Sequence, residues 1–154
     1  MSVYGSNKKE ESMKRLILIV MLLLPLGVMA QDDGFASLLK RYSAMQHCTT
    51  IELSHDMLQS MGIKADIDKM SIISVESRGL FDDFRREVDG VVADKALFMS
   101  VNSGDGKVNI YHTKGVSGAT TEMVIVTEND SAFVVVYLTG SDIALNDIES
   151  LIKL

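Results

Sequence analysis

Four short runs rich in apolar, β-branched and aromatic residues constrain the fold of this chain more than any other feature. They cover residues 97–101, 108–112, 123–127 and 132–138. The glycines in 102–106 can supply the positive φ angles of a hairpin, and a polar tetrapeptide separates the last two runs. Short strands joined by such turns are typical of an antiparallel meander. The run 132–138 is apolar on both faces, which predicts a central strand.

Segments with helical periodicity flank this meander. The clearest is 80–92, where an apolar stripe alternates with charged residues spaced three and four apart. A first amphipathic helix is predicted from Phe35 to Met45, and Gly140–Asp142 is expected to cap a last one. Further predicted elements are strands at 48–53 and 71–75, and a short helix that Ser54 caps and Gly62 ends.

The order of these elements predicts the fold class. Helices and short strands come first, then the meander, then a closing helix, which favours an α+β fold over a doubly wound parallel sheet. We expect an antiparallel meander sheet packed against amphipathic helices as a two-layer sandwich.

The N-terminal region has the pattern of an export signal. Two basic residues at 14–15 precede an apolar core at 16–28 and a small residue, Ala30. A membrane-spanning helix needs about 20 apolar residues, whereas only fifteen positions run from Leu16 to Ala30, and Pro25 interrupts them. We therefore favour a signal peptide cleaved after Ala30 over a membrane anchor, and expect a periplasmic or secreted protein with no membrane insertion after cleavage.

We expect residues 1–30 to be an N-terminal extension and signal peptide, with translation starting at Met1 or, more in keeping with a signal, at Met13. Residues 31–154 are long enough for one domain with a single core. Residues 1–30 contain four of the fifteen basic and two of the twenty-one acidic residues. The remaining chain has 11 basic and 19 acidic residues, which is a formal net charge of −8. An acidic chain without a basic cluster argues against nucleic acid as a partner.

The single cysteine, Cys48, excludes an intrachain disulfide. It begins an apolar segment that looks like a buried strand, which favours an inert buried thiol over an intermolecular disulfide. A lipoprotein signal would need a cysteine where Gln31 stands, so we expect no lipid anchor.

The ionisable residues do not form a recognisable metal site. His47 and His55 are eight positions apart, with Cys48 beside the first, but zinc ligands usually come in closer pairs. Asp66–Asp68 and the 102–106 loop are rich in oxygen ligands, yet neither continues to the terminal glutamate of an EF-hand. We expect turns there, no metal and no cofactor, a surface position for His55 in the first turn of its helix, and a polar side chain near a strand end for His112.

Nor does the sequence contain a catalytic motif. The segment Gly115–Gly118 lacks the frame of a Gly-x-Ser-x-Gly nucleophile elbow around Ser117. Neighbouring carboxylates such as Asp82 and Asp83 carry no information without a cleft to hold them. No residue is therefore assigned a catalytic, cofactor or metal role.

Several local patterns after the apolar N-terminal core occur together. They are Ala30–Gln31, Phe35 and Tyr42, the segment 53–61 with Ser54-x-x-Met57-Leu58, the strand Leu97–Val101, and Leu138-x-Gly140. In these patterns, which cover the region after the signal, the chain resembles the small exported bacterial proteins of the domain of unknown function 4252 family. The resemblance implies a compact α+β domain in a bacterial envelope and brings no activity or catalytic residues.

Two functional hypotheses remain. The first is a non-enzymatic module that binds an envelope protein or peptide. It is favoured by the missing catalytic motif and by six methionines after residue 30 that could line an adaptable surface, although core filling is the better explanation for most of them. The alternative is a small-ligand carrier or hydrolase whose site is assembled from residues scattered in sequence. The sequence does not predict an oligomeric state.

The helix at 80–92 yields a first test. If its apolar stripe is buried, replacing Phe84 by Ala removes a large side chain from the core and should lower the free energy of unfolding by about 3 to 5 kcal/mol. Urea denaturation of both proteins measures the difference. A midpoint that does not move would contradict the assignment.

Overall fold

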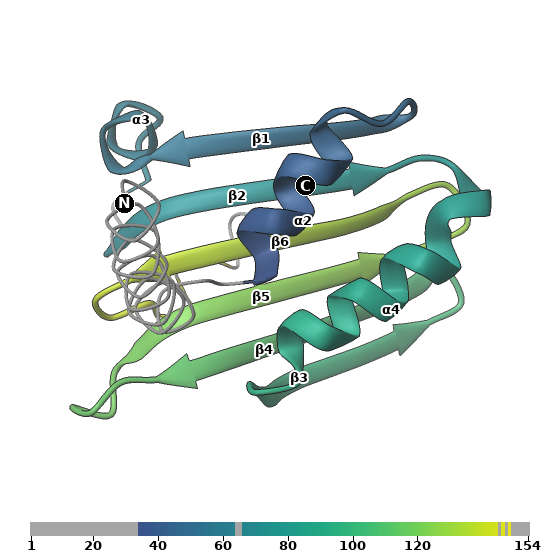
Figure 1. Ribbon diagram of the computed structural model, residues 1–154. Coiled ribbons are helices and arrows are strands. Elements are labelled where there is room, and N and C mark those ends of the chain that lie inside the picture. Colours follow the sequence, from purple (N-terminus) through teal and green to yellow (C-terminus); the bar gives the residue numbers. More distant parts are fainter. Residues whose placement is uncertain (1–33, 64–65, 145, 147, 149–154) are drawn as a thin grey trace, which may run out of the picture. The chain divides into compact units, whose positions relative to one another are not determined.

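The structure is a computed structural model that describes residues 34–63, 66–144, 146 and 148. Its strands are β1 (Cys48–Ser54), β2 (Ile67–Val75), β3 (Ala96–Ser103), β4 (Gly106–Lys114), β5 (Thr120–Glu128) and β6 (Phe133–Gly140). They form one antiparallel sheet in the order β1-β2-β6-β5-β4-β3 (Figure 1). The α+β class and the meander of β3 to β6 are confirmed, and β6 is an inner strand as predicted.

Two boundaries differ from the prediction. Strand β2 begins at Ile67 instead of Ser71, within the Asp66–Asp68 segment expected to be a turn, because its first residues pair with the end of β6. The loop expected at 102–106 shrinks to Gly104 and Asp105, since both strands continue into it. Gly106 has φ 157°, and a Cβ there would lie 2.5 Å from the carbonyl oxygen of Glu128. Only glycine fits this close approach.

The helices are α2 (Gly34–Ser43), α3 (His55–Ser60), the 3-10 turn η1 (Arg78–Leu80) and α4 (Phe81–Val92). The predicted cap of α3 is present: the Ser54 hydroxyl accepts a hydrogen bond from the Met57 backbone N–H at 3.4 Å, and Gly62 follows with φ 83°. The predicted last helix lies largely outside the described residues. Each helix in the described part falls short of the length or apolar character needed to cross a bilayer.

Helices α2 and α4 lie over one face of the sheet (Figure 1). Phe84 of α4 is fully buried between them and the sheet, with its ring centroid 4.8 Å from that of Tyr42 and 4.9 Å from that of Phe133. Phe35 of α2 stacks on Tyr137 of β6 at 4.9 Å. These aromatic pairs join both helices to the inner strand β6. The stripe predicted for 80–92 is therefore confirmed.

A second apolar cluster lies on the opposite face of the sheet. It contains Leu58 of α3, Ile143 and Ile148, which pack with residues from β2, β4, β5 and β6. The strand residues are Ile67, Met70, Ile110, Met123, Ile125 and Leu138. Successive residues of a strand alternate between faces, so β5 and β6 contribute to both clusters.

An ionic cluster around the buried Lys95 side chain lies at the connection between α4 and β3. The side chain of Lys95 is only 5% exposed, and its Nζ lies 3.2 Å from Glu122 Oε2 and 3.3 Å from Asp94 Oδ1. The Tyr137 hydroxyl donates to Glu122 Oε1 at 2.6 Å. Burial alone would raise the pKa of Glu122, but the Tyr137 hydrogen bond and the Lys95 charge lower it below its ordinary value.

Strand β1 is not the buried strand that the sequence suggested. It lies at one edge of the sheet, and most of its residues are exposed or half-buried. Cys48 is a free, half-buried thiol, and burial, followed by the negative charge of Glu76, raises its pKa.

Tyr42 provides a pH-dependent contribution to stability. Its ring is 2% exposed, and burial, then a hydrogen bond to Glu87 and the charge of that carboxylate, raise its pKa from 10.0 to about 12. The unfolded chain therefore loses this proton at lower pH than the folded protein. The stabilising effect is complete below pH 10 and disappears as pH rises toward 12.

Replacing Tyr42 by Phe should remove this loss of stability at alkaline pH. We expect the free energy of unfolding of the unsubstituted protein to fall by about 2 kcal/mol more than that of the variant between pH 9 and pH 12. Urea denaturation across this range measures the difference. The control variant Tyr111→Phe keeps Tyr42 and should behave like the unsubstituted protein. If the free energy of unfolding of Tyr42→Phe falls with pH as steeply as that of the unsubstituted protein, the assignment is contradicted.

Candidate binding edge

Strand β3 is the outermost strand of the sheet at the edge opposite β1 (Figure 1). All eight of its residues are exposed. It pairs with β4 on one side, and no described residue pairs with its other side. Part of its backbone N–H and C=O groups are therefore directed away from the protein, in the position where a further strand would bind.

The composition of β3 differs from that of a protected edge. Natural edge strands usually carry lysine, other charges or proline, which prevent pairing with another chain. The sequence of β3, ALFMSVNS, contains none of these, and four of its apolar residues are large and exposed. They are Leu97 (57% exposed), Phe98 (45%), Met99 (38%) and Val101 (48%). A bulge lies between Leu97 and Met99, so the regular part of the edge runs from Met99 to Ser103.

The two faces of β3 differ in polarity. Met99 pairs with Ile110, and Val101 pairs with Val108, so these residues share the face of the second apolar cluster. The Phe98 ring lies 5.1 Å from that of His112 at an angle of 57°. One face of β3 thus continues an apolar surface of β4 to the margin of the sheet.

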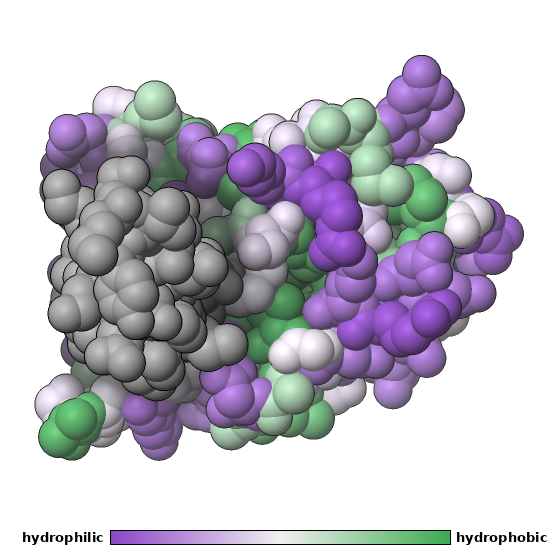
Figure 2. Space-filling view, in the orientation of Figure 1, coloured by the Kyte–Doolittle hydropathy of each residue, from purple (hydrophilic) through white to green (hydrophobic). Residues whose placement is uncertain are grey.

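The other face of β3 is mainly polar. Ser100 pairs with Asn109, and its hydroxyl donates to Asn109 Oδ1 at 2.6 Å. Asn102 pairs with Lys107 on the same face, where Leu97 is the only large apolar residue of the strand. In the space-filling view, hydrophilic residues dominate the outer surface of α4, whereas hydrophobic residues reach the lower margin where β3 runs (Figure 2).

The opposite edge is less suited to strand pairing. In β1, Glu52 forms an ion pair with Lys69 at 3.3 Å, which places a charge on this edge. Ile51 is exposed, but its neighbours Thr50 and Glu52 are polar. A charged edge strand opposes the approach of a second strand more than an uncharged one does.

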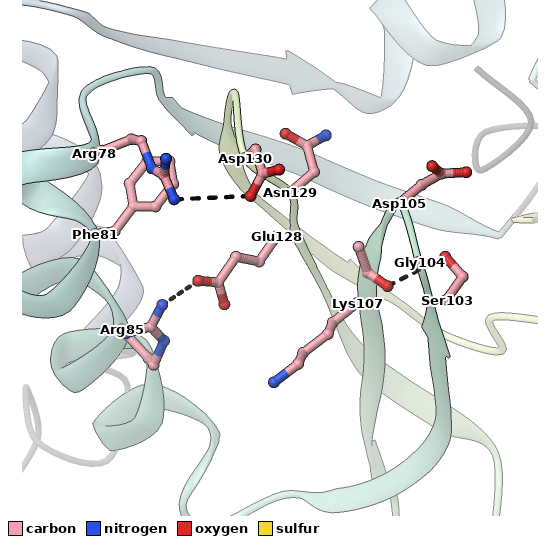
Figure 3. Close-up of a pocket in the computed structure, with 11 residues that line it drawn as sticks. Arg78, Phe81, Arg85, Ser103, Gly104, Asp105, Lys107, Glu128, Asn129 and Asp130 are labelled. Carbon is pink, nitrogen blue, oxygen red and sulfur yellow. Dashed lines mark hydrogen bonds and ion pairs between the residues drawn. The ribbon is translucent and has the colours of Figure 1, made fainter.

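A charged pocket of about 290 Å³ lies next to the turn that ends β3. Figure 3 shows Arg78 and Arg85 on the helical side of this pocket and Lys107 pointing into it from β4. Arg85 pairs with Glu128 and lies 5.7 Å from the centroid of the Phe133 ring. Arg78 is 3.8 Å from Asp130. Cations and carboxylates alternate around the pocket, so it has no excess of either charge.

A second pocket, of about 450 Å³, lies between α2 and α4. Tyr42, Met45 and Leu80 supply its apolar wall, and Arg41 pairs with Glu87 Oε1 at 2.6 Å beside it. The outer pair Arg86 and Asp83 is 3.0 Å apart. No imidazole, thiol or serine lines this pocket.

The histidines and the cysteine weighed as metal ligands do not converge. His47 is exposed in the turn before β1, with φ 61°, and Cys48 points to the first apolar cluster. His55 Nδ1 lies 2.9 Å from the Ile67 carbonyl oxygen, and His112 contacts Phe98. Within the described residues, no group of three or more histidines, cysteines or carboxylates could hold a metal ion.

The remaining residues weighed for chemistry have structural positions. Ser117 lies in the turn from β4 to β5, which the Gly115 N–H closes by donating to the Ala119 carbonyl oxygen at 2.8 Å. Asp82 and Asp83 each bind an arginine three residues ahead. Of the six methionines, Met57, Met61 and Met99 are exposed, Met70 and Met123 are buried, and Met45 packs partly against the core. Core filling thus accounts for Met70 and Met123, whereas Met57, Met61 and Met99 lie on the surface.

Sequence reasoning located β3 but did not identify it as an edge. No local signal was available, because all four predicted strands of the meander are rich in apolar residues and free of charge. The position of the strand at the margin of the sheet depends on pairing between β2 and β6, which are far apart in sequence.

The comparisons with known proteins yield a family and no function. No curated protein and no solved structure matches the chain. A protein-family model described as a domain of unknown function, DUF4252, matches residues 37–151, which is most of the chain and nearly all of the described region. The chain therefore belongs to the DUF4252 family.

Proposed function

We propose that this protein is a non-enzymatic binding module that takes an extended segment of a protein or peptide onto the edge of β3. The observation that supports this proposal is the exposed, uncharged and apolar edge strand. Strand addition draws its affinity from main-chain hydrogen bonds and its specificity from alternate side chains. Both requirements are met by β3, because its outer backbone groups have no described strand partner and its faces differ in polarity.

The two faces define the chemistry of the segment that would bind. Directly opposed residues in an antiparallel pair lie on the same face of the sheet. Side chains opposite Met99 and Val101 should be apolar, and the side chain opposite Ser100 should be small or polar. The preferred segment is thus an extended strand with alternating apolar and polar residues.

The ionic cluster before β3 holds the edge in place. Lys95 immediately precedes the strand, and its contacts with Glu122 tie the start of β3 to β5. A preorganised edge binds an extended segment with a smaller entropic cost than a loose one does.

The alternative, a small-ligand carrier or hydrolase, has weaker support. The pocket between α2 and α4 has an apolar wall and nearby charges, which a small ligand could use. Neither described pocket combines a nucleophile with an imidazole or thiol, so the arrangement favours a carrier over a hydrolase.

A synthetic probe peptide can test strand addition. The probe is an octapeptide of alternating valine and threonine with a lysine at each end, and its control carries N-methyl groups on alternate backbone nitrogens. We expect NMR shifts confined to β3 and its neighbour β4 with the probe, and at least tenfold weaker binding of the N-methylated control, because strand addition depends on main-chain hydrogen bonds.

A matched pair of substitutions completes this test. Val101→Lys places a charge on the edge and should abolish binding of the probe. Val116→Lys makes the same change at a fully exposed position in the turn after β4 and should leave binding unchanged. Equal affinities in the two variants, or shifts distributed away from β3, would contradict the proposed function.

We also propose that the module works in the bacterial envelope, after removal of the signal peptide. The support is the basic, apolar and small-residue pattern that ends at Ala30. Intact-mass spectrometry of the protein recovered from its host should give a chain beginning at Gln31. A chain that retains Met1 or Met13 would overturn this location.

A further inference from the structure

We infer that the occupant of the β3 edge is a second copy of this chain, paired antiparallel around Ser100. This inference rests on the proposed function, because it names the partner of the same edge. It makes the protein a symmetric dimer in which two six-stranded sheets join into one.

The register of β3 is self-complementary around Ser100. When two copies of the strand run antiparallel with Ser100 opposite Ser100, Met99 of each copy lies opposite Val101 of the other. Met99 and Val101 occupy the same face, as their pairing with Ile110 and Val108 shows. Directly opposed residues must share a face, so this register satisfies the pleat of both strands.

The apolar contacts continue across the proposed junction. In each copy the row on one face runs from Ile125 through Ile110 to Met99, by pairing of β5 with β4 and of β4 with β3. In the dimer, Val101 and Val108 of the second copy extend this row, and the twofold axis generates its equivalent. The side chains of Met99 and Val101, now 38% and 48% exposed, would gain apolar neighbours from the second copy.

The polar contacts are equally compatible. On the other face, Ser100 lies on the twofold axis and its hydroxyl already donates to Asn109 at 2.6 Å. The two serine side chains at the axis are small, and each keeps its hydrogen bond to Asn109 of its own copy. This face would place no large apolar residue at the axis.

Charge favours β3 over β1 as the self-pairing edge. The whole chain has a formal net charge of −6, so most surfaces of two copies repel each other. Strand β3 contains no charged residue, and like charges therefore do not meet when it pairs with itself. Two β1 strands would bring a carboxylate, Glu52, to the junction.

The symmetry of the contact limits the assembly. Pairing of β3 with β3 is isologous, since the same surface is used by both copies, and it leaves no second β3 edge exposed. The sheet then ends in β1 on both sides, where Glu52 lies in an ion pair with Lys69. A closed dimer is expected rather than a fibre.

Cysteine cross-linking tests both the partner and the register. In a Cys48→Ala background, Ser100→Cys brings two thiols to the twofold axis, where opposed Cα atoms lie about 4.5 to 5.5 Å apart, within the range of a disulfide. Asn102→Cys is the matched control on the same face and strand. Its two copies would be separated by about 13 Å along the strands, too far for a disulfide.

We expect the Ser100→Cys protein to form a disulfide-linked dimer under mild oxidation, seen on a non-reducing gel, and at least tenfold less adduct with Asn102→Cys. Circular dichroism checks that both variants fold. Equal adducts would overturn the register, and no adduct with Ser100→Cys in a folded protein would overturn pairing around this residue.

Sedimentation velocity of the full-length, host-processed protein gives an independent test. The unsubstituted chain and Val116→Lys should sediment as dimers, and Val101→Lys as a monomer. A dimer that survives Val101→Lys, or an unsubstituted chain that stays monomeric at 100 μM, would overturn the inference. If the chain is monomeric but still binds the alternating valine and threonine peptide at β3, only the identity of the partner is wrong. If the chain neither dimerises nor binds this peptide, the proposed function is overturned as well.

Discussion

The packing of Phe84 between Tyr42 and Phe133 is the interaction on which the rest of the structure depends. It connects α2, α4 and the inner strand β6 through two edge-to-face contacts with centroid distances of 4.8 and 4.9 Å. Because β6 pairs with both β2 and β5, fixing it fixes the order of the whole sheet. The edge positions of β1 and β3 therefore follow from the packing of Phe84, although neither strand contributes a ring to that contact.

This arrangement explains why β3 is both ordered and uncovered. Helix α4 ends at Val92 with its apolar stripe directed at β5 and β6, and the chain reaches β3 through Lys95. The Lys95 side chain is buried beside the half-buried Glu122, and removing Glu122 would leave the Lys95 charge without its partner on β5. Lys95 thus holds the start of β3 without placing any helix over it.

The local elements could be predicted from sequence, but their neighbours in space could not. Periodicity identified Phe84 as a core residue, and the side chain of Ser54 together with Gly62 marked both ends of α3. The burial of a strand depends on pairing between distant segments, so β1 was expected to be buried although it lies at an edge. The buried cluster of Lys95 and Glu122 joins residues 27 positions apart, and no local pattern reveals such a contact.

The same reasoning explains why the candidate site is a strand edge and not a constellation of catalytic groups. Charged residues such as Arg85 and Glu128 already satisfy one another, and the described histidines lie apart from one another in the structure. The groups of β3 that have no described partner are backbone N–H and C=O groups, which an edge strand leaves unpaired on its outer side. A sheet edge of this kind persists in an acidic protein where another strand covers it or where repulsion elsewhere keeps other chains away. The net charge of −6 supplies such repulsion, and under our proposal the uncharged sequence of β3 would confine pairing to this one edge.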